Sequence, residues 1–223
     1  MNTKELLLQV SSSAGTVSAE YRLPDAPVAL LTLAHGAGAG MNHPFMTSLA
    51  DELAACGIAT LRFNFPFIEK KQRRVDFPAV AHKTVEAAIS EGRRSFPDLP
   101  LFAAGKSFGG RMSSQYLSAH PVDFVQGIIF YGFPLHPPDK VSSERAEHLK
   151  PVSTPILFLQ GTKDEMAEPN LFRQVCTSLQ RSTLVEIEGA DHGFKKGKQN
   201  VVPELALHTK EWVMRILGSS GQY

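Results

Sequence analysis

Cysteine is scarce in this sequence, and nothing in its spacing suggests a pairing. Cys56 and Cys176 are the two cysteines among 223 residues, and they stand far apart in the chain. One distant pair is unlike the dense, regularly spaced cysteines of small secreted domains. We therefore expect both residues to be reduced and buried as small apolar side chains.

Long hydrophobic runs and an excess of one charge are also missing. The N-terminal run Leu6–Leu8 is too short for the core of a signal peptide, and no run approaches the ~20 residues of a membrane span. A net charge of +1 gives no general attraction to nucleic acid or to anionic lipid. These absences favour a cytoplasmic protein that binds neither nucleic acid nor membranes.

The composition is that of an ordinary globular protein, with 43% hydrophobic and 20% charged residues. Residues 1–223 are therefore expected to form a single domain. Strand patterns cover 6–10, 16–23, 28–34, 58–63, 100–105, 125–131, 155–160 and 183–187. Helical spacing covers 44–56, 76–96, 108–120, 170–179 and 201–217, with one more short helix in 134–153.

The alternation of these elements predicts an α/β fold, with about eight strands in a mostly parallel sheet flanked by helices. Ala14 and Gly15 suit a hairpin turn between the first two strands, and Asp76 or a neighbour suits the cap of the helix that follows it. Parallel strands joined by helices place their carboxyl ends on one rim, where sites form in open sheets.

The strongest motif is Gly105-Lys106-Ser107-Phe108-Gly109, which matches G-x-S-x-G. It follows a predicted strand and opens a predicted helix, which is the context of a nucleophile elbow. The small flanking residues leave room for strand and helix to approach, and the turn lifts the Ser107 hydroxyl above the rim. We interpret Ser107 as a nucleophile; the alternative is a glycine-rich turn with an incidental serine.

A serine hydroxyl needs a base, and two downstream turns offer one. Asp164 follows the strand at 155–160, and His192 follows the last strand, so both fall on the rim of Ser107. We assign His192 as the general base and Asp164 as the carboxylate that orients it. Glu165 and Asp191 are rival acids, although a residue adjacent to the histidine reaches its ring poorly.

The loop His35-Gly36-Ala37-Gly38-Ala39-Gly40 follows the third strand, where the second donor of an oxyanion hole is expected. We predict that the Ala37 amide, or that of Gly36 or Gly38, works with the Phe108 amide. Gly36 and Gly38 would also let substrate approach the backbone. A phosphate-binding loop is the competing reading, but the pattern lacks the residues that such loops require.

Three segments together resemble the α/β-hydrolases: 34–43, 62–66 and 105–111. They are most similar to a branch that groups small bacterial proteins with a testis-expressed animal protein and a subunit of a histone-acetyltransferase complex. A more distant similarity is to dienelactone hydrolases, from which this chain differs by a serine nucleophile in place of cysteine. The resemblance implies an α/β-hydrolase fold without a large lid and a triad at Ser107, Asp164 and His192.

Two further segments bear on the substrate. The basic run 69–74 follows a strand and is expected to lie over the same rim; it is either a solvated charge cluster or a site where Arg73 or Arg74 binds an anionic group. Lys106 either adds to the positive charge of this run or lies on the surface.

The segment 134–153 is too short for a lid, so we expect an open, shallow pocket. Its candidate lining residues, which could instead belong to the core, are Phe65, Phe67, Phe108 and Phe133.

The sequence thus predicts a serine hydrolase that acts on a small or extended carboxylic ester through an acyl-enzyme, with no metal or cofactor. Its partner is expected to be a small-molecule ester. The alternative is a non-catalytic binding or scaffold module on the same fold, because the fold alone does not fix the function.

Overall fold

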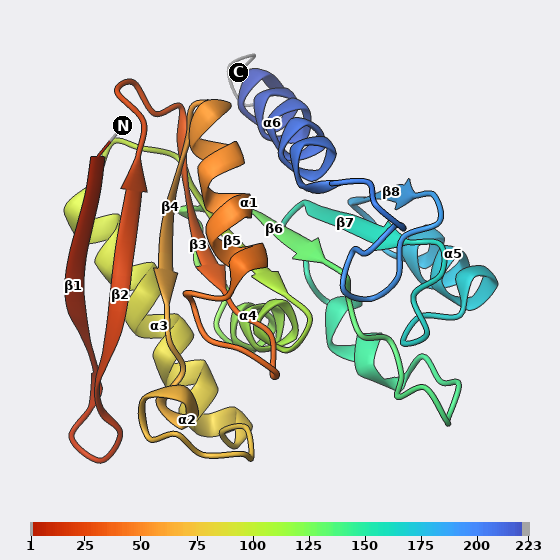
Figure 1. The fold of residues 1–223 in the computed structure, drawn as a ribbon, viewed down its shortest axis with the longest axis horizontal. Coiled ribbons are helices and arrows are strands. Elements are labelled where there is room, and N and C mark those ends of the chain that lie inside the picture. Colours follow the sequence, from red (N-terminus) through yellow and green to blue (C-terminus); the bar gives the residue numbers. More distant parts are fainter. Residues whose placement is uncertain (1, 220–223) are drawn as a thin grey trace.

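The computed structural model describes residues 2–219, and their strands form one eight-stranded sheet. The strand order is β1-β2-β4-β3-β5-β6-β7-β8, so β1 and β8 form the two edges (Figure 1). Met1 and residues 220–223, which the predicted domain includes, lie outside the described residues.

The first two strands form the expected hairpin at one edge. β1 (Asn2–Ser11) pairs antiparallel with β2 (Gly15–Leu23), and β2 in turn pairs antiparallel with β4. Gly15 begins β2 at φ +81°, a conformation that glycine adopts without strain, so the turn that Ala14 and Gly15 predicted is confirmed.

The other strand pairs are all parallel, and the predicted strands agree closely with the observed ones. β3, β4 and β7 are buried at every position, as continuous apolar strands covered by helices on both faces must be. The six remaining strands are β3 (Ala29–Ala34), β4 (Ile58–Phe63), β5 (Leu101–Lys106), β6 (Val125–Tyr131), β7 (Ile156–Gly161) and β8 (Ser182–Ile187).

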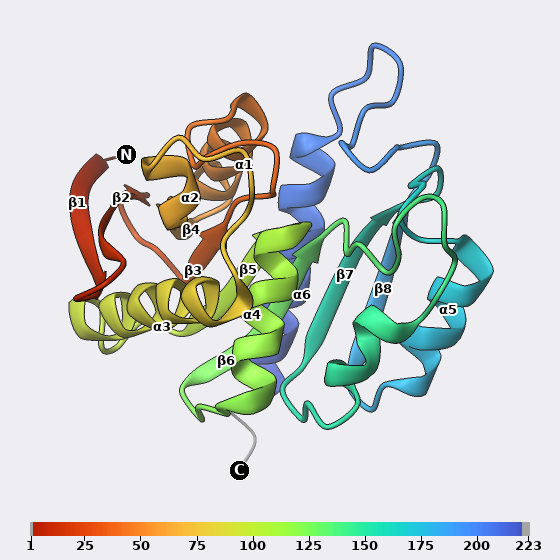
Figure 2. The same ribbon diagram turned by 90° about the horizontal axis from the view of Figure 1, so that it is seen from below.

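Helices cover both faces of the sheet and divide the core in two (Figures 1 and 2). α1 (Pro44–Ala55) and α6 (Val202–Ser219) pack against each other on one face. α3 (Pro78–Ser95), α4 (Phe108–Ala119) and α5 (Pro169–Ser178) cover the other face.

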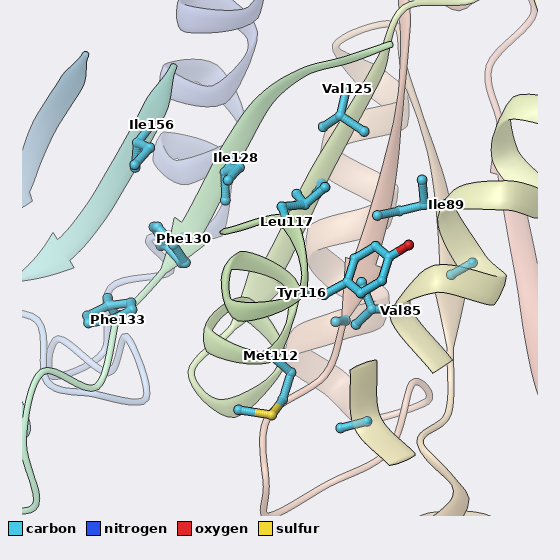
Figure 3. Packing of buried hydrophobic residues seen from close by; sticks show 14 of the residues in the cluster. Val85, Ile89, Met112, Tyr116, Leu117, Val125, Ile128, Phe130, Phe133 and Ile156 are labelled. Carbon is cyan, nitrogen blue, oxygen red and sulfur yellow. The ribbon is translucent and has the colours of Figure 1, made fainter. Parts of the chain in front are cut away.

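The core beneath α3 and α4 is built from helix positions one turn apart. Val85 and Ile89 of α3 lie beside Met112 and Tyr116 of α4, next to the apolar side chains of β6 (Figure 3). On the opposite face, Trp212 of α6 is buried. This packing fixes the start of α4 relative to the ends of the neighbouring strands.

The two cysteines are separated by the sheet. Cys176 belongs to the core on the α4 face, whereas Cys56 packs on the α1 face, and both are free thiols. The prediction of two unpaired cysteines is confirmed, but only Cys176 is buried as expected, and Cys56 is partly exposed.

The cap of α3 was predicted at Asp76 or a neighbour, and the N-cap residue is the neighbour Phe77. α3 begins at Pro78, and no side chain caps it, so the expected capping by Asp76 is wrong. Proline at the first position suits a helix start because its φ is preset and it has no N–H to satisfy. Asp76 instead accepts a hydrogen bond from the Phe67 amide at 3.1 Å, which closes the loop around the short helix α2 (Pro66–Glu69).

The carboxyl ends of the parallel strands share one rim, as predicted. Residues 132–155 join β6 to β7 across this rim with a single 3₁₀ helix, η1 (Glu144–Leu149). Within residues 2–219 no lid is inserted there, so the ends of β3, β5, β7 and β8 are open to a ligand.

Candidate active site

Ser107 stands in a tight turn between β5 and α4. Its φ is 49° and its ψ is −115°, which is a strained combination for a residue with a side chain. A Cβ atom at Gly105 would lie 2.4 Å from the Gly110 nitrogen, and one at Gly109 would lie 2.4 Å from the His35 carbonyl oxygen. Glycine at these positions is therefore a steric requirement of the turn, as the motif predicted.

Three side chains from three separate segments form one hydrogen-bonded row. The Nδ1 atom of His192 lies 2.7 Å from Oδ2 of Asp164, and its Nε2 atom lies 2.8 Å from Oγ of Ser107. Because a carboxylate only accepts hydrogen bonds, Nδ1 carries the proton and Nε2 is left to accept from the hydroxyl. The structure thus brings together the three residues that the sequence singled out.

The Asp164 side chain is fully buried, whereas 21% of the His192 side chain is exposed. Oδ2 of Asp164 also accepts from Nε2 of Gln160 at 2.6 Å, and Oδ1 accepts from the Met166 amide at 2.8 Å. Gln160 in turn accepts from the Phe133 amide at 2.8 Å. These contacts hold the carboxylate in a fixed orientation toward the imidazole.

Sequence reasoning missed Gln160. The available signal was a polar residue near the end of a strand that is otherwise apolar. Of the rival acids, Glu165 is exposed, and Asp191 accepts from the Lys195 amide at 2.8 Å within its own turn.

Lys106 lies beside the row and not on the open surface. Its Nζ atom donates to the His192 carbonyl at 2.6 Å and stands over the Phe194 ring. Burial lowers the pKa of this amine to about 8, although Asp164 and Asp191 favour its charged form. The bond ties the loop that carries the imidazole to the strand that carries the serine.

The glycine-rich loop after β3 runs past Ser107. A Cβ atom at Gly36 would lie 3.7 Å from Cβ of Ser107, so this loop backbone is in contact with the serine. Within residues 2–219 the Ala37 amide has no hydrogen-bond partner. The Phe108 amide is the first of α4 and likewise has no intrahelical acceptor.

His35 anchors the start of this loop. It is fully buried; Nδ1 lies 2.7 Å from the Gly36 carbonyl and Nε2 accepts from the Phe65 amide at 3.0 Å. Burial lowers its pKa to about 4, so the ring stays neutral and can serve as both donor and acceptor. These contacts give His35 a structural role at the start of the loop.

A cavity of about 410 Å³ opens at Ser107 and His192. The phenylalanines proposed as lining do not contribute to it: Phe65, Phe67 and Phe133 are buried in the core, and Phe108 packs edge-on against the first two. The remaining lining comes from the glycine-rich loop, the start of α1 and two turns: Gly36, Ala37, Gly38, Ala39, His43, Phe45, Met46, Lys106, Met166 and Gly193.

Phe45, Met46 and Met166 supply the apolar part of this lining and were not foreseen. Phe45 stacks on Phe194 at 5.7 Å between ring centroids, which fixes the side of the cavity. The signal for Phe45 and Met46 was their place at the start of the helix that follows the glycine-rich loop.

The structure does not bring Arg73 and Arg74 to the cavity. Both are exposed in the loop between α2 and α3, and Arg74 lies over the Phe77 ring at 5.0 Å. Neither is part of the wall around Ser107. A contact between them and a substrate at Ser107 has no support from their position.

Residues 2–219 contain neither a cluster of metal ligands nor a membrane-spanning helix. No three histidine, cysteine, aspartate or glutamate side chains come together as a metal site would require. No helix combines the length and the apolar character that crossing a bilayer demands.

Comparison with known proteins places the chain among hydrolases. A family model described as an alpha/beta hydrolase domain matches residues 27–213. A dienelactone hydrolase from Anabaena variabilis is 22% identical over 96% of this chain and 99% of its own, with a TM-score of 0.76. An α/β serine hydrolase without a lid from Xanthomonas campestris is 23% identical over 96% of this chain and 95% of its own, with a TM-score of 0.74.

A serine hydrolase homologue from Coxiella burnetii is also similar, at 21% identity over 96% of this chain and 97% of its own, with a TM-score of 0.73. At these identities the likeness is one of fold. It confirms the predicted α/β-hydrolase fold, which the dienelactone hydrolase from Anabaena variabilis shares.

Proposed function

The chain belongs to the alpha/beta hydrolase domain family, and on that premise we propose that it is a serine hydrolase that cleaves carboxylic esters. The observation that carries the proposal is the unbroken row from the Ser107 hydroxyl through His192 to the buried carboxylate of Asp164. A hydroxyl, an imidazole with a free acceptor nitrogen and an orienting carboxylate are the groups that acyl transfer requires. The proposal treats residues 1–223 as one catalytic domain.

In the first half-reaction Oγ of Ser107 attacks the ester carbonyl while Nε2 of His192 takes its proton. The carboxylate of Asp164 stabilises the imidazolium, which then gives the proton to the departing alcohol. In the second half-reaction His192 removes a proton from water, the hydroxide attacks the acyl-enzyme, and Ser107 leaves with the proton. The net change is hydrolysis of one ester bond.

The amides of Ala37 and Phe108 are proposed to bind the oxyanion. Both are free of other hydrogen bonds and both border Ser107, one in the loop after β3 and one at the start of α4. Each such donor contributes roughly 3 kcal/mol to stabilising the transition state.

The cavity supports a preference for small or extended acyl groups. It is about 410 Å³, and Phe45, Met46 and Met166 give it an apolar side. Apolar walls with a few polar groups suit an ester. No lid covers the rim in the described residues, so little apolar surface is available to enclose a long lipid chain.

Labelling with a fluorophosphonate tests the serine directly. The wild type is expected to be labelled, and Ser107→Ala is expected to lose both the label and at least ~10⁴-fold of kcat for p-nitrophenyl acetate. Ser178→Ala is the matched control, because Ser178 is exposed on α5 and bonds only to the Val175 carbonyl. A folded wild type that neither labels nor hydrolyses the ester would overturn the proposal in favour of a non-catalytic binding or scaffold module.

A further inference from the structure

A second hollow lies between α4 and the connection from β6 to β7, two segments that run side by side (Figure 2). Its volume is about 420 Å³. Arg111 lines it from α4, and Lys140, Glu144 and Arg145 line it from the connection. We call this hollow the arginine pocket. Its three cationic side chains outnumber its one acidic side chain, so it carries an excess of positive charge.

Arg111 lacks the partner that a half-buried guanidinium normally has. Its Nε atom is buried and unbonded, and within residues 2–219 its side chain makes no hydrogen bond or ion pair. Arg22 and Arg62 also leave Nε unbonded, but each binds a carboxylate through another nitrogen, of Asp51 and Glu20 respectively. Leaving the N–H donors of a charged group without acceptors costs free energy, so a ligand that supplies acceptor oxygens to Arg111 would be stabilised.

The other charged side chains that line the arginine pocket are the cations Lys140 and Arg145 and the single acid Glu144. Burial lowers the pKa of Arg111, and the nearby Arg145 lowers it further. His136 uses both ring nitrogens, at 2.8 Å from the Pro137 carbonyl and 2.8 Å from the Glu168 amide. Arg145 donates to the Pro134 carbonyl at 3.4 Å, and within residues 2–219 none of its bonds is to a carboxylate. Guanidinium groups present the fork geometry that binds carboxylate or phosphate oxygens.

The arginine pocket adjoins the cavity at Ser107. The Arg111 amide donates to the Ser107 carbonyl at 3.1 Å, so the two residues are one helical turn apart, ~5.4 Å along the axis. The His136 amide donates to the Met166 carbonyl at 3.0 Å, and Met166 lines the cavity at Ser107. Two backbone hydrogen bonds thus connect the walls of the two spaces, although no residue lines both.

We infer that the arginine pocket binds a carboxylate or phosphate group through Arg111 and Arg145, and that this group is the anionic end of the ester substrate. The second half of the inference rests on the proposed function, whereas anion binding does not. The preferred substrate is then an ester that carries an acidic group several bonds away from the scissile carbonyl.

Hydrolysis of two matched esters tests the substrate class. Mono-p-nitrophenyl glutarate carries a terminal carboxylate, and p-nitrophenyl valerate has the same acyl length without the charge. The wild type is expected to prefer the glutarate ester, and Arg111→Gln to raise its KM by ~10-fold or more while leaving KM for the valerate ester unchanged. Arg111→Lys, which keeps the charge and loses the fork, should fall between the two.

Arg215→Gln is the matched control, because Arg215 is exposed on α6. Isothermal titration with glutarate and with inorganic phosphate gives a readout that needs no catalysis. We expect saturable binding to the wild type and to Arg215→Gln, and its loss in Arg111→Gln; urea unfolding of each variant establishes that it is folded.

The outcomes separate the two claims. Anion binding that survives in folded Arg111→Gln would refute the claim that the arginine pocket binds the anion through Arg111. Equal KM changes for both esters, or an effect of Arg74→Gln in place of Arg111→Gln, would overturn its role in substrate choice. A chain that hydrolyses neither ester but binds phosphate through Arg111 would refute the proposed function and leave the pocket standing.

Discussion

Replacing Lys106 by methionine is expected to lower kcat for p-nitrophenyl acetate without a matching change in KM. Methionine keeps the apolar stem of the side chain and removes the amine that donates to the His192 carbonyl at 2.6 Å. A hydrogen bond from a charged donor is worth ~1.5–3 kcal/mol. If the lost free energy raises the activation barrier in full, because the imidazole is no longer held in place, kcat falls by roughly 10- to 100-fold.

The pH profile gives a second signature of the same contact. The pKa of the Lys106 amine is about 8, so the amine is charged below this pH and neutral above it. The bond to His192 weakens as the charge is lost, so wild-type kcat is expected to decline as the pH rises through about 8. Lys106→Met should show no such decline.

The stability of the variant follows from the sign of the same shift. The folded-state pKa lies below the ordinary value of 10.5, so the unfolded chain holds the proton more tightly. This group therefore adds stability as the pH rises from about 8 toward 10.5 and disfavours folding below that window. Removing the charge in Lys106→Met should consequently leave the protein folded at neutral pH, which urea unfolding checks.

Lys163→Met is the matched control, because Lys163 is exposed in the turn after β7. Steady-state kinetics from pH 6 to 10 compares the three proteins. The reasoning is refuted if Lys106→Met keeps the wild-type kcat and its alkaline decline, or if Lys163→Met loses as much activity.

Two predictions concern the stability of the turn at Ser107, measured as the free energy of unfolding in urea. Gly109→Ala places a Cβ atom 2.4 Å from the His35 carbonyl oxygen and should cost ~3 kcal/mol or more, whereas Gly38→Ala meets no atom within 4 Å and should change stability by less than ~0.5 kcal/mol. Similar costs for the two would contradict the close approach of strand and helix. Ser107→Gly should be ~1 kcal/mol more stable than Ser107→Ala, because glycine tolerates a φ of 49°; equal stabilities would mean that the turn stores no strain.

The sequence was sufficient for the fold and for the row of three side chains. Alternating apolar segments identified every strand, and a turn that follows a parallel strand must fall on the common rim. Ser107, Asp164 and His192 each stand just after such a strand, so their meeting could be inferred without coordinates.

The lining of the cavity could not be inferred in that way. Phe65 and Phe67 lie near a strand end, as a lining residue would, but the loop folds inward against His35 and buries them. The direction of a side chain within a loop depends on tertiary contacts that periodicity does not record. The same limit applies to Asp76, which closes a loop where a helix cap was expected.

The contact partners of long side chains could not be predicted from the sequence either. Lys106 and Arg111 stand on either side of the nucleophile in sequence, yet one reaches the His192 carbonyl and the other reaches the arginine pocket. Their flexible stems span several ångströms, so their partners are set by whichever elements pack nearby.

The order in which the three residues occur along the chain has a consequence for biosynthesis. In the proposed mechanism the nucleophile Ser107 follows β5, the orienting acid Asp164 follows β7, and the base His192 follows β8. During translation the serine emerges long before the histidine, so a nascent or truncated chain carries an inert hydroxyl. Hydrolytic activity would then begin only when β8 has joined the sheet, so the onset of ester hydrolysis would show when the sheet is complete.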